Sequence, residues 1–280
     1  MTNYLTLREY FGALVSNPDS GLTETETDDI LDTIAELSLT VEQLCSRRFD
    51  ERIETRQYLP RPLGHNLGGD VDGRDLVLDD DLYTPSAVYD GVDARTLDSS
   101  EYYLSPLGGP PYTIVRLVNP TQRWGLNYSG DEVFHTVTGV WSPTGVIWKY
   151  LTTCGAANDT TTTLSLGDNT VVEQGMTLKV DSEYMRVESV TNTGVVVTRA
   201  VNGSTAASHS NGANVYYFRV NPVVRRLMKR LASWWNLQTS APDGVIQVGD
   251  IAVTVNTGRV PQDITATINQ LKRATRIGRV

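Results

Sequence analysis

Histidine and cysteine are the side chains most often used in nucleophilic and metal chemistry, and this sequence holds few of them. His65 lies in a glycine-rich segment, His135 in an alternating stretch typical of a strand, and His209 in a Ser/Asn/Gly turn. No two of them have the spacing of a metal-binding motif such as HExxH. Cys45 and Cys154 lie in no nucleophile signature, and the sequence has no Walker loop, no GxGxxG loop after a strand and no GxSxG elbow. The sequence therefore predicts no catalytic residue, no metal ligand and no cofactor.

The acidic segment Asp70-Val71-Asp72-Gly73-Arg74-Asp75, followed by aspartates at 79–81, is the best candidate for a cation site. Hard cations such as Ca²⁺ prefer several oxygen ligands. The segment departs from an EF-hand because Arg74 occupies a ligand position, Asp75 replaces the required glycine, and helices do not flank it. We interpret it as a solvated acidic loop, with a calcium site as the alternative.

Five tryptophans raise the question of a sugar-binding platform, because indole rings stack on sugars as readily as they fill a core. Trp141 and either Trp234 or Trp235 continue apolar stripes, so packing is the favoured role. Trp124, which lies beside Arg123 and close to Tyr128, is the candidate for an exposed contact.

Two amphipathic helices are the clearest elements that position other residues. One covers about 28–45 behind a cap at Thr27 or Asp28, and the other covers about 221–236 behind Asn221 and Pro222. Each has one apolar stripe, and we expect the two stripes to pack together. The helix-core candidates are Ile30, Ile34, Leu37, Val41 and Leu44 in the first helix, and Val224, Leu227 and Leu231 in the second.

The remaining elements are short. Thr6 caps a brief first helix, and residues 261–276 form a candidate last helix. Five strand candidates between 153 and 217 are spaced like those of a small sandwich or barrel. The predicted fold class is α+β, with a small helical-bundle core, β strands and long loops, plus an inserted all-β domain. The predicted domains are 1–152 (first part of the core), 153–217 (inserted β domain) and 218–280 (core helix, β segment and tail).

The charge is unevenly distributed along the 280 residues. The net charge is −9, acidic residues crowd the first hundred positions, and basic residues prevail from Arg219 onward. The basic end is suited to an acidic partner surface, or alternatively neutralises the acidic end of the same domain. The absence of a secretion signal and of about 18 consecutive apolar residues predicts a chain made in the cytoplasm without membrane contact.

Several short motifs occur in a characteristic order. They are the opening Tyr4-Leu5-Thr6-Leu7-Arg8-Glu9-Tyr10, the helix ending in Cys45-Ser46-Arg47-Arg48-Phe49, Thr55-Arg56-Gln57-Tyr58, Val137-Thr138-Gly139-Val140-Trp141, and the helix from Asn221 to Trp235. Together they resemble the head–tail connector (adaptor) proteins of tailed bacteriophages. The match covers about 1–60 and 130–152 and the helix near 221–236. The β segment 153–217 is a departure from the short members of that family.

The resemblance implies a structural subunit of the virion neck, assembled in the host cytoplasm. In that family about 12 copies form a ring beneath the portal protein and conduct double-stranded DNA without recognising its sequence. The expected partners are the portal protein, tail or neck proteins and other copies of the chain. The candidate portal contacts are Lys272, Arg273, Arg276 and Arg279, and the candidate tail or intersubunit contacts are His65, Arg123, Trp124 and Tyr128.

The inserted segment has a resemblance of its own, to a small β module of phage structural proteins. The matching residues are Val180, Glu183, Met185 and Val187 in a strand pair, then Arg199, Gly203, Ser204 and His209 in a following turn, with Ser204 in place of threonine.

Two other classes of function stay open. One is another virion component, such as a tail-completion or decoration protein. The other is a carbohydrate- or calcium-binding module or a depolymerase, in which two carboxylates would face each other across a cleft.

Overall fold

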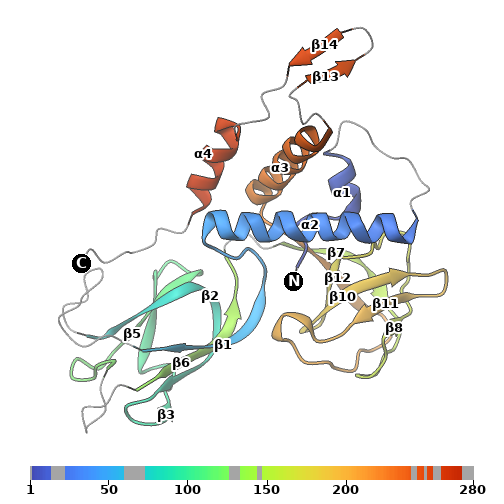
Figure 1. Cartoon of the computed structure of the whole chain (residues 1–280). Helices are drawn as coiled ribbons and strands as arrows, with labels where there is room; N and C mark the ends of the chain where they lie inside the picture. Colours follow the sequence, from blue (N-terminus) through green and yellow to red (C-terminus); the bar gives the residue numbers. More distant parts are fainter. Residues whose placement is uncertain are drawn as a thin grey trace. The chain divides into compact units, whose positions relative to one another are not determined.

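A computed structural model describes residues 2–13, 23–59, 73–125, 133–143, 147–240, 245–248, 251–254 and 260–272 (Figure 1). Contacts divide the chain into two compact units. Unit 1 comprises Met1–Phe49 and Gly145–Arg273, and unit 2 comprises Asp50–Thr144 and Ala274–Val280. The stretch Asp50–Thr144 of unit 2 is therefore inserted in sequence between the two stretches of unit 1.

Four helices belong to unit 1: α1 (Leu7–Phe11), α2 (Glu24–Cys45), α3 (Pro222–Ser240) and α4 (Gln262–Leu271). Thr6 caps α1 in a reciprocal capping box with Glu9, as predicted. Asn221 caps α3 by accepting the Val223 N–H at 2.9 Å, also as predicted. The cap predicted for α2 was wrong, because the helix begins four residues earlier behind Thr23. A second Thr-x-x-Glu capping box, formed with Glu26, extends α2 by one turn.

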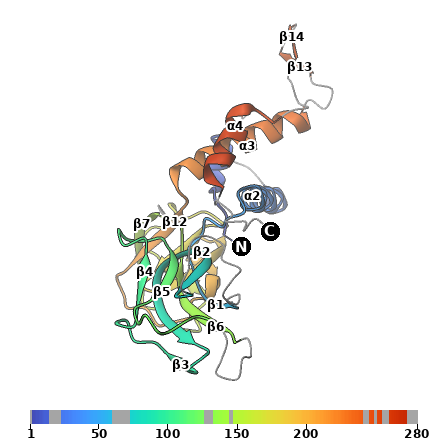
Figure 2. The same cartoon turned by 90° about the vertical axis from the view of Figure 1, so that its left-hand side faces the viewer.

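The helices share one apolar core (Figures 1 and 2). Ile34, Leu37 and Val41 of α2 are at most 3% exposed, and Ile30 is half-buried against the same cluster. Leu44 was a wrong core candidate, because its side chain is 41% exposed and Cys45 takes the buried position. The other members of this helical core include Tyr10, Val224, Leu227, Met228, Leu231, Ile264 and Ile268.

Tyr4 joins the beginning of the chain to two distant segments of unit 1. Its ring is 2% exposed and lies 6.1 Å from the Phe49 ring and 6.2 Å from the Phe218 ring, centroid to centroid. Its hydroxyl accepts the Phe49 N–H at 2.8 Å and donates to the Glu42 carboxylate. The residue therefore fixes the end of α2 next to the strand that leads into α3.

The sheet of unit 1 is antiparallel, in the order β7-β12-β9-β10-β11-β8. Backbone hydrogen bonds from Gly155 to Ser165 (2.7 Å) and from Gly167 to Thr153 (2.8 Å) join the end of β7 to residues just after β8, so the two edge strands meet there. The predicted limits of the inserted domain fall inside β7 and β12. The strands are β7 (Ile147–Cys154), β8 (Thr163–Leu164), β9 (Thr177–Val180), β10 (Glu183–Val190), β11 (Val195–Thr198) and β12 (Ala213–Arg219).

Unit 2 contains a second antiparallel sheet, in the order β1-β6-β2-β5-β4, with β3 paired to β2. Strand β2 contains Asp79, Asp80 and Asp81, so the prediction of a solvated loop at these positions was wrong. Its core contains Leu82, Val88, Val115, Val137 and Trp141, all fully buried. The strands are β1 (Arg52–Tyr58), β2 (Asp75–Asp90), β3 (Arg95–Thr96), β4 (Tyr102–Ser105), β5 (Tyr112–Leu117) and β6 (His135–Trp141).

The predicted fold class was wrong. The described chain is mostly β, with two six-stranded sheets and a helical content of 26%, so a small helical bundle is not the centre of an α+β fold. Strands β13 (Val245–Val248) and β14 (Ile251–Thr254) add an antiparallel pair between α3 and α4. Among the described helices, none combines the length and the hydropathy needed to cross a bilayer.

The helical core predicts opposite results for two leucines of α2. We expect Leu37→Ala to lower the free energy of unfolding by about 2–5 kcal/mol, because it leaves a cavity in a packed core. Leu44→Ala, the matched control, should change it by no more than about 0.5 kcal/mol. Urea unfolding monitored by circular dichroism measures both values. Equal losses would show that α2 packs by a different face.

Candidate functional site

A buried charge cluster occupies the sheet of unit 1, where Glu183 begins β10. The Glu183 side chain has no exposed surface, and Arg199 binds it with Nε to Oε1 at 2.6 Å and Nη2 to Oε2 at 2.6 Å. The backbone N–H groups of Ala200 and Ala207 also donate to it, at 3.2 and 2.9 Å. Burial acts to raise the pKa of Glu183, but the hydrogen bonds, with those from Arg199 the largest, outweigh burial and hold the pKa below its usual value.

His209 extends this cluster to the surface. Its Nε2 lies 3.0 Å from Glu183 Oε2, and its Nδ1 lies 2.8 Å from Asp181 Oδ2. The imidazole ring therefore lies between two carboxylates. Arg199 also donates to the carbonyl oxygens of Asn158, Thr161 and Ala207. The cluster therefore ties the loop at 158–161 and the turn around Ala207 to the start of β10.

These are the residues that carried the resemblance to the small β module. Glu183, Arg199 and His209 lie far apart in sequence but meet here. Ser204 accepts the Tyr184 N–H at 2.9 Å, which shows why a hydroxyl residue stands at that position. Val180, Met185 and Val187 fill the apolar core beside the cluster.

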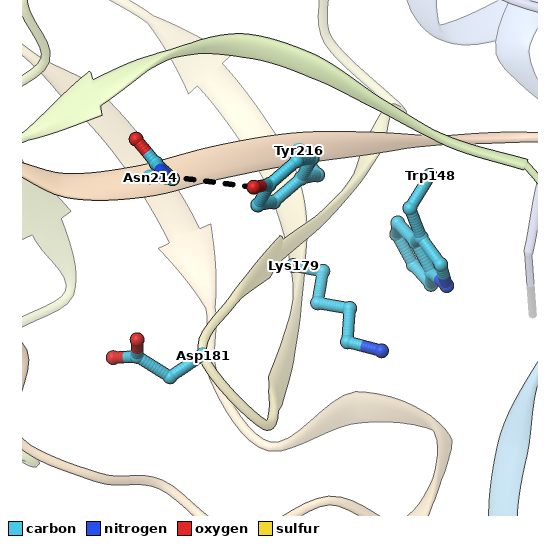
Figure 3. Close-up of a pocket in the computed structure, with 5 residues that line it drawn as sticks. All are labelled: Trp148, Lys179, Asp181, Asn214 and Tyr216. Carbon is cyan, nitrogen blue, oxygen red and sulfur yellow. Dashed lines mark hydrogen bonds between the residues drawn. The ribbon is translucent and has the colours of Figure 1, made fainter.

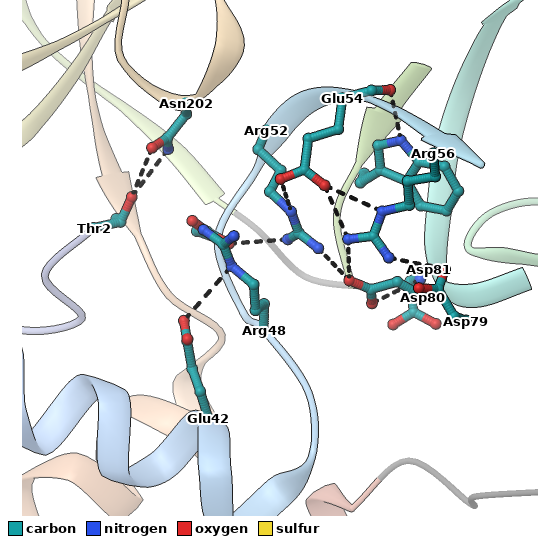
Figure 4. A network of polar contacts seen from close by, with 12 residues as sticks. Thr2, Glu42, Arg48, Arg52, Glu54, Arg56, Asp79, Asp80, Asp81 and Asn202 are labelled. Atoms are coloured by element: carbon teal, nitrogen blue, oxygen red, sulfur yellow. Dashed lines mark hydrogen bonds and ion pairs between the residues drawn. The ribbon is translucent and has the colours of Figure 1, made fainter. Parts of the chain in front are cut away.

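Unit 2 contains a comparable network at the junction of β1, β2 and β6 (Figure 4). The buried Arg52 binds Asp50 at 3.0 Å, Glu54 at 2.9 Å and Asp80. Sequence reasoning did not find this network, although Arg52, Glu54 and Arg56 alternate along one face of a strand, which is a usable signal.

Arg56 continues the network in unit 2. It binds Glu54 at 2.9 Å, Asp79 at 2.9 Å and Asp80 at 3.1 Å, and its guanidinium lies 4.4 Å from the centroid of the Trp141 ring. Burial acts to lower the pKa of Arg56, but the neighbouring carboxylates, Asp79 first, raise it overall. The guanidinium is therefore permanently charged and serves as a structural cation.

Three of the acidic residues that suggested a cation site, Asp75, Asp79 and Asp80, form ion pairs with arginines. Asp75 binds Arg116 at 3.0 Å, and Asp79 accepts the Tyr58 hydroxyl at 2.6 Å. Asp70 and Asp72 lie outside the described residues. Within the described ranges, no group of three His, Cys, Asp or Glu side chains is placed to hold a metal.

Both cysteines are buried free thiols. Burial raises the pKa of Cys154, and it raises the pKa of Cys45 to about 11. Thiols with raised pKa values are poor nucleophiles at neutral pH.

The four candidates for tail or intersubunit contacts differ in their exposure or lie outside the described residues. Trp124 was a wrong candidate for an exposed contact, because it is 4% exposed, donates its indole N–H to the Arg74 carbonyl at 2.7 Å and packs edge-on against His135. Arg123 is half-buried and donates to the carbonyl oxygens of Pro120 and Gln122. His65 and Tyr128 lie outside the described residues.

The basic residues from α3 to the C-terminus also differ in their surroundings. Arg225 binds Glu9 at 2.8 Å, and Arg230 binds Asp263 at 2.5 Å, so these two neutralise charges of their own unit. Lys272 follows α4 directly and is exposed. Arg273, Arg276 and Arg279 lie outside the described residues.

The sequence was compared with known proteins. It matches no protein-family model, and a search of curated proteins returns no relative.

The Glu183 cluster yields a prediction for unit 1. We expect Glu183→Gln to lower the free energy of unfolding at pH 7 by about 3–5 kcal/mol, because it leaves Arg199 and His209 buried without their anion. Glu188→Gln, an exposed position of the same strand, is the matched control.

The pH dependence follows from the lowered pKa of Glu183. Its contribution is present above the ordinary glutamate pKa of about 4.3 and is lost as the pH falls through the folded-state value. Wild type should therefore lose more stability than Glu183→Gln between pH 7 and strongly acidic pH, as measured by chemical denaturation. Parallel pH profiles would show that the carboxylate is not held in its charged form by folding.

Proposed function

We propose that this chain is a structural head-to-tail adaptor subunit of a tailed-phage virion, which forms a ring beneath the portal protein and surrounds the passing DNA. The observation that carries the proposal is how the motif-bearing segments meet. Strands β1 and β6, about 80 residues apart, pair along seven positions, with Arg52 opposite Trp141 and Tyr58 opposite His135. In unit 1, α2 and α3 share one core although nearly the whole β structure separates them in sequence.

The order of motifs thus corresponds to contacts within each unit. Tyr4, which belongs to the opening motif, contacts Phe49, which ends the helix motif. Motif residues that contact each other in the fold support an architecture shared with the adaptor family more strongly than the same residues in the sequence alone.

The charge of the chain suits a conduit. A net charge of −9 disfavours tight, sequence-independent binding of phosphates, which is driven by Lys and Arg. Repulsion of this kind acts within about 10 Å at physiological salt, so it affects only DNA that passes close by.

The portal-docking segment begins after α4. Ile264 and Ile268 of α4 are 1% and 7% exposed in the helical core, so α4 is a structural part of unit 1. Lys272, Arg273, Arg276 and Arg279 follow it as a basic run suited to an acidic surface on the portal.

This assignment predicts a charge-dependent attachment. The triple variant Arg273→Glu, Arg276→Glu and Arg279→Glu should weaken binding to the portal protein of the same virus at least tenfold, because each reversal replaces an attraction with a repulsion. Wild-type binding should also weaken as salt is raised. Co-sedimentation with purified portal rings measures both effects.

The matched control places the same charge change on Arg8, Lys149 and Arg226, which are exposed elsewhere. Its attachment should stay close to wild type if charge position matters and net charge does not. Unchanged binding of the tail variant would refute the docking segment. Deletion of 262–280 is a poorer test, because it also removes Ile264 and Ile268 from the core.

A further inference from the structure

A hollow on the sheet of unit 1 is lined by side chains from three strands and one turn (Figure 3). Its volume is about 360 Å³, and it is lined by Trp148 of β7, Lys179 of β9, Asp181 of the turn after β9, and Asn214 and Tyr216 of β12. This volume lies at the lower end of the range of small-molecule sites. It suits a ligand of one or two small rings.

Strand register brings these side chains to one face. Tyr216 lies opposite Lys179 on one side and opposite Tyr150 on the other, across three neighbouring strands. Val215 pairs with Thr152 and Tyr216 pairs with Tyr150, so Leu151 is the extra residue of a bulge in β7 at this point. Trp148 and Asp181 lie at opposite ends, with Lys179 and Tyr216 between them (Figure 3).

The aromatic end of the hollow is rigid. The Trp148 ring is stacked on the buried Tyr184 ring, with centroids 5.4 Å apart and planes at 3°. The Lys179 Nζ lies 5.2 Å from each of these ring centroids. Next to them Tyr150 is 53% exposed and meets Tyr216 edge-on at 6.0 Å. Packed aromatic rings present a surface that loses little freedom when a ligand binds.

The polar end is held by the buried charge cluster. Asp181 has a positive φ of 52°, as a tight hairpin turn requires, and its side chain is 62% exposed. His209 binds its Oδ2 at 2.8 Å, and His209 is itself fixed by Glu183. Buried residues therefore hold the Asp181 carboxylate at the rim in one orientation before a ligand binds.

The donors and acceptors of the hollow define the ligand class. An ammonium group, a carboxylate, an amide and a phenol hydroxyl alternate around aromatic rings, and Asn214 Nδ2 already reaches the Tyr216 hydroxyl at 3.5 Å. A sugar ring presents the complementary features, because hydroxyls around its edge both donate and accept while its C–H face is apolar. A polyanion such as single-stranded DNA fits worse, since the single lysine is offset by Asp181.

We propose that this hollow is a binding site for a neutral sugar unit of a glycan. The site would bind a saccharide whether or not the chain is an adaptor. Trp148 and Tyr216 supply the aromatic surface, and Asp181, Asn214 and Lys179 bind the hydroxyls.

The experiment uses the full chain and six named sugars: glucose, galactose, N-acetylglucosamine, cellobiose, lactose and chitobiose. Saturation-transfer NMR detects contact, and calorimetric titration measures affinity. We expect saturable binding of at least one sugar with a dissociation constant in the millimolar range or tighter, as for a small, shallow site. Tyr216→Ala and the exposed Asn214→Ala should each weaken it about tenfold or more, which corresponds to about 1.4 kcal/mol.

Tyr83→Ala, which removes an exposed tyrosine of β2 in unit 2, is the matched control and should leave the affinity unchanged. Asn214→Ala keeps the test valid if Tyr216→Ala fails to fold. The proposal is overturned if none of the six sugars binds saturably, if Tyr83→Ala weakens binding as much as Asn214→Ala, or if an oligothymidylate binds the hollow and the sugars do not.

Discussion

The packing of Tyr4 against the end of α2 and the end of β12 is the contact on which unit 1 depends. It brings three segments from different parts of the chain to one point, and its hydroxyl pairs with the Phe49 N–H and the Glu42 carboxylate in an otherwise apolar setting. A buried tyrosine contributes a large apolar surface and needs a partner for its polar end, and Tyr4 has both. Because α2 and α3 meet here, the chain between them can form separate β structures without loss of the shared helical core.

Charge inside the two units sets the second constraint. In unit 1, the buried Glu183 is paired with Arg199 and contacts His209, and in unit 2, the buried Arg52 is balanced by Asp50, Glu54 and Asp80. Removing one partner of such a group leaves an isolated buried charge, which costs far more than the intact pair contributes. The networks therefore fix the positions of the strands and turns that contribute to them. Surface residues attached to a network, such as Asp181, are held in place as well.

Local sequence patterns correctly predicted the features that depend on residues close together in the chain. The apolar stripe of α2, the Asn221-Pro222 start of α3 and the alternation of β6 are set by neighbours within a few residues, and each lies where it was expected. Leu44 was misplaced because the stripe narrows in the last turn, where Cys45 is buried instead. Strand β2 was missed because its three aspartates are typical of a loop, and only their arginine partners on β1 make a strand tolerable.

The sites depended on long-range pairing and were harder to predict. The sequence motif contains Glu183, Arg199 and His209, but it does not show that they contact each other. That contact depends on the fold of the sheet. Lys179 and Tyr216 become neighbours only through strand register, which no local pattern contains. Trp124 was judged exposed from polar neighbours in sequence, whereas its neighbours in space are His135 and the backbone of Arg74.

Electron cryomicroscopy of the purified chain mixed with portal rings from the same virus tests the central claim most directly. The account predicts a closed ring of about 12 copies seated on the tail-facing side of the portal, with an open bore along its axis. A chain that stays monomeric beside unoccupied portals, or one that binds only the outer surface of capsids, would contradict it.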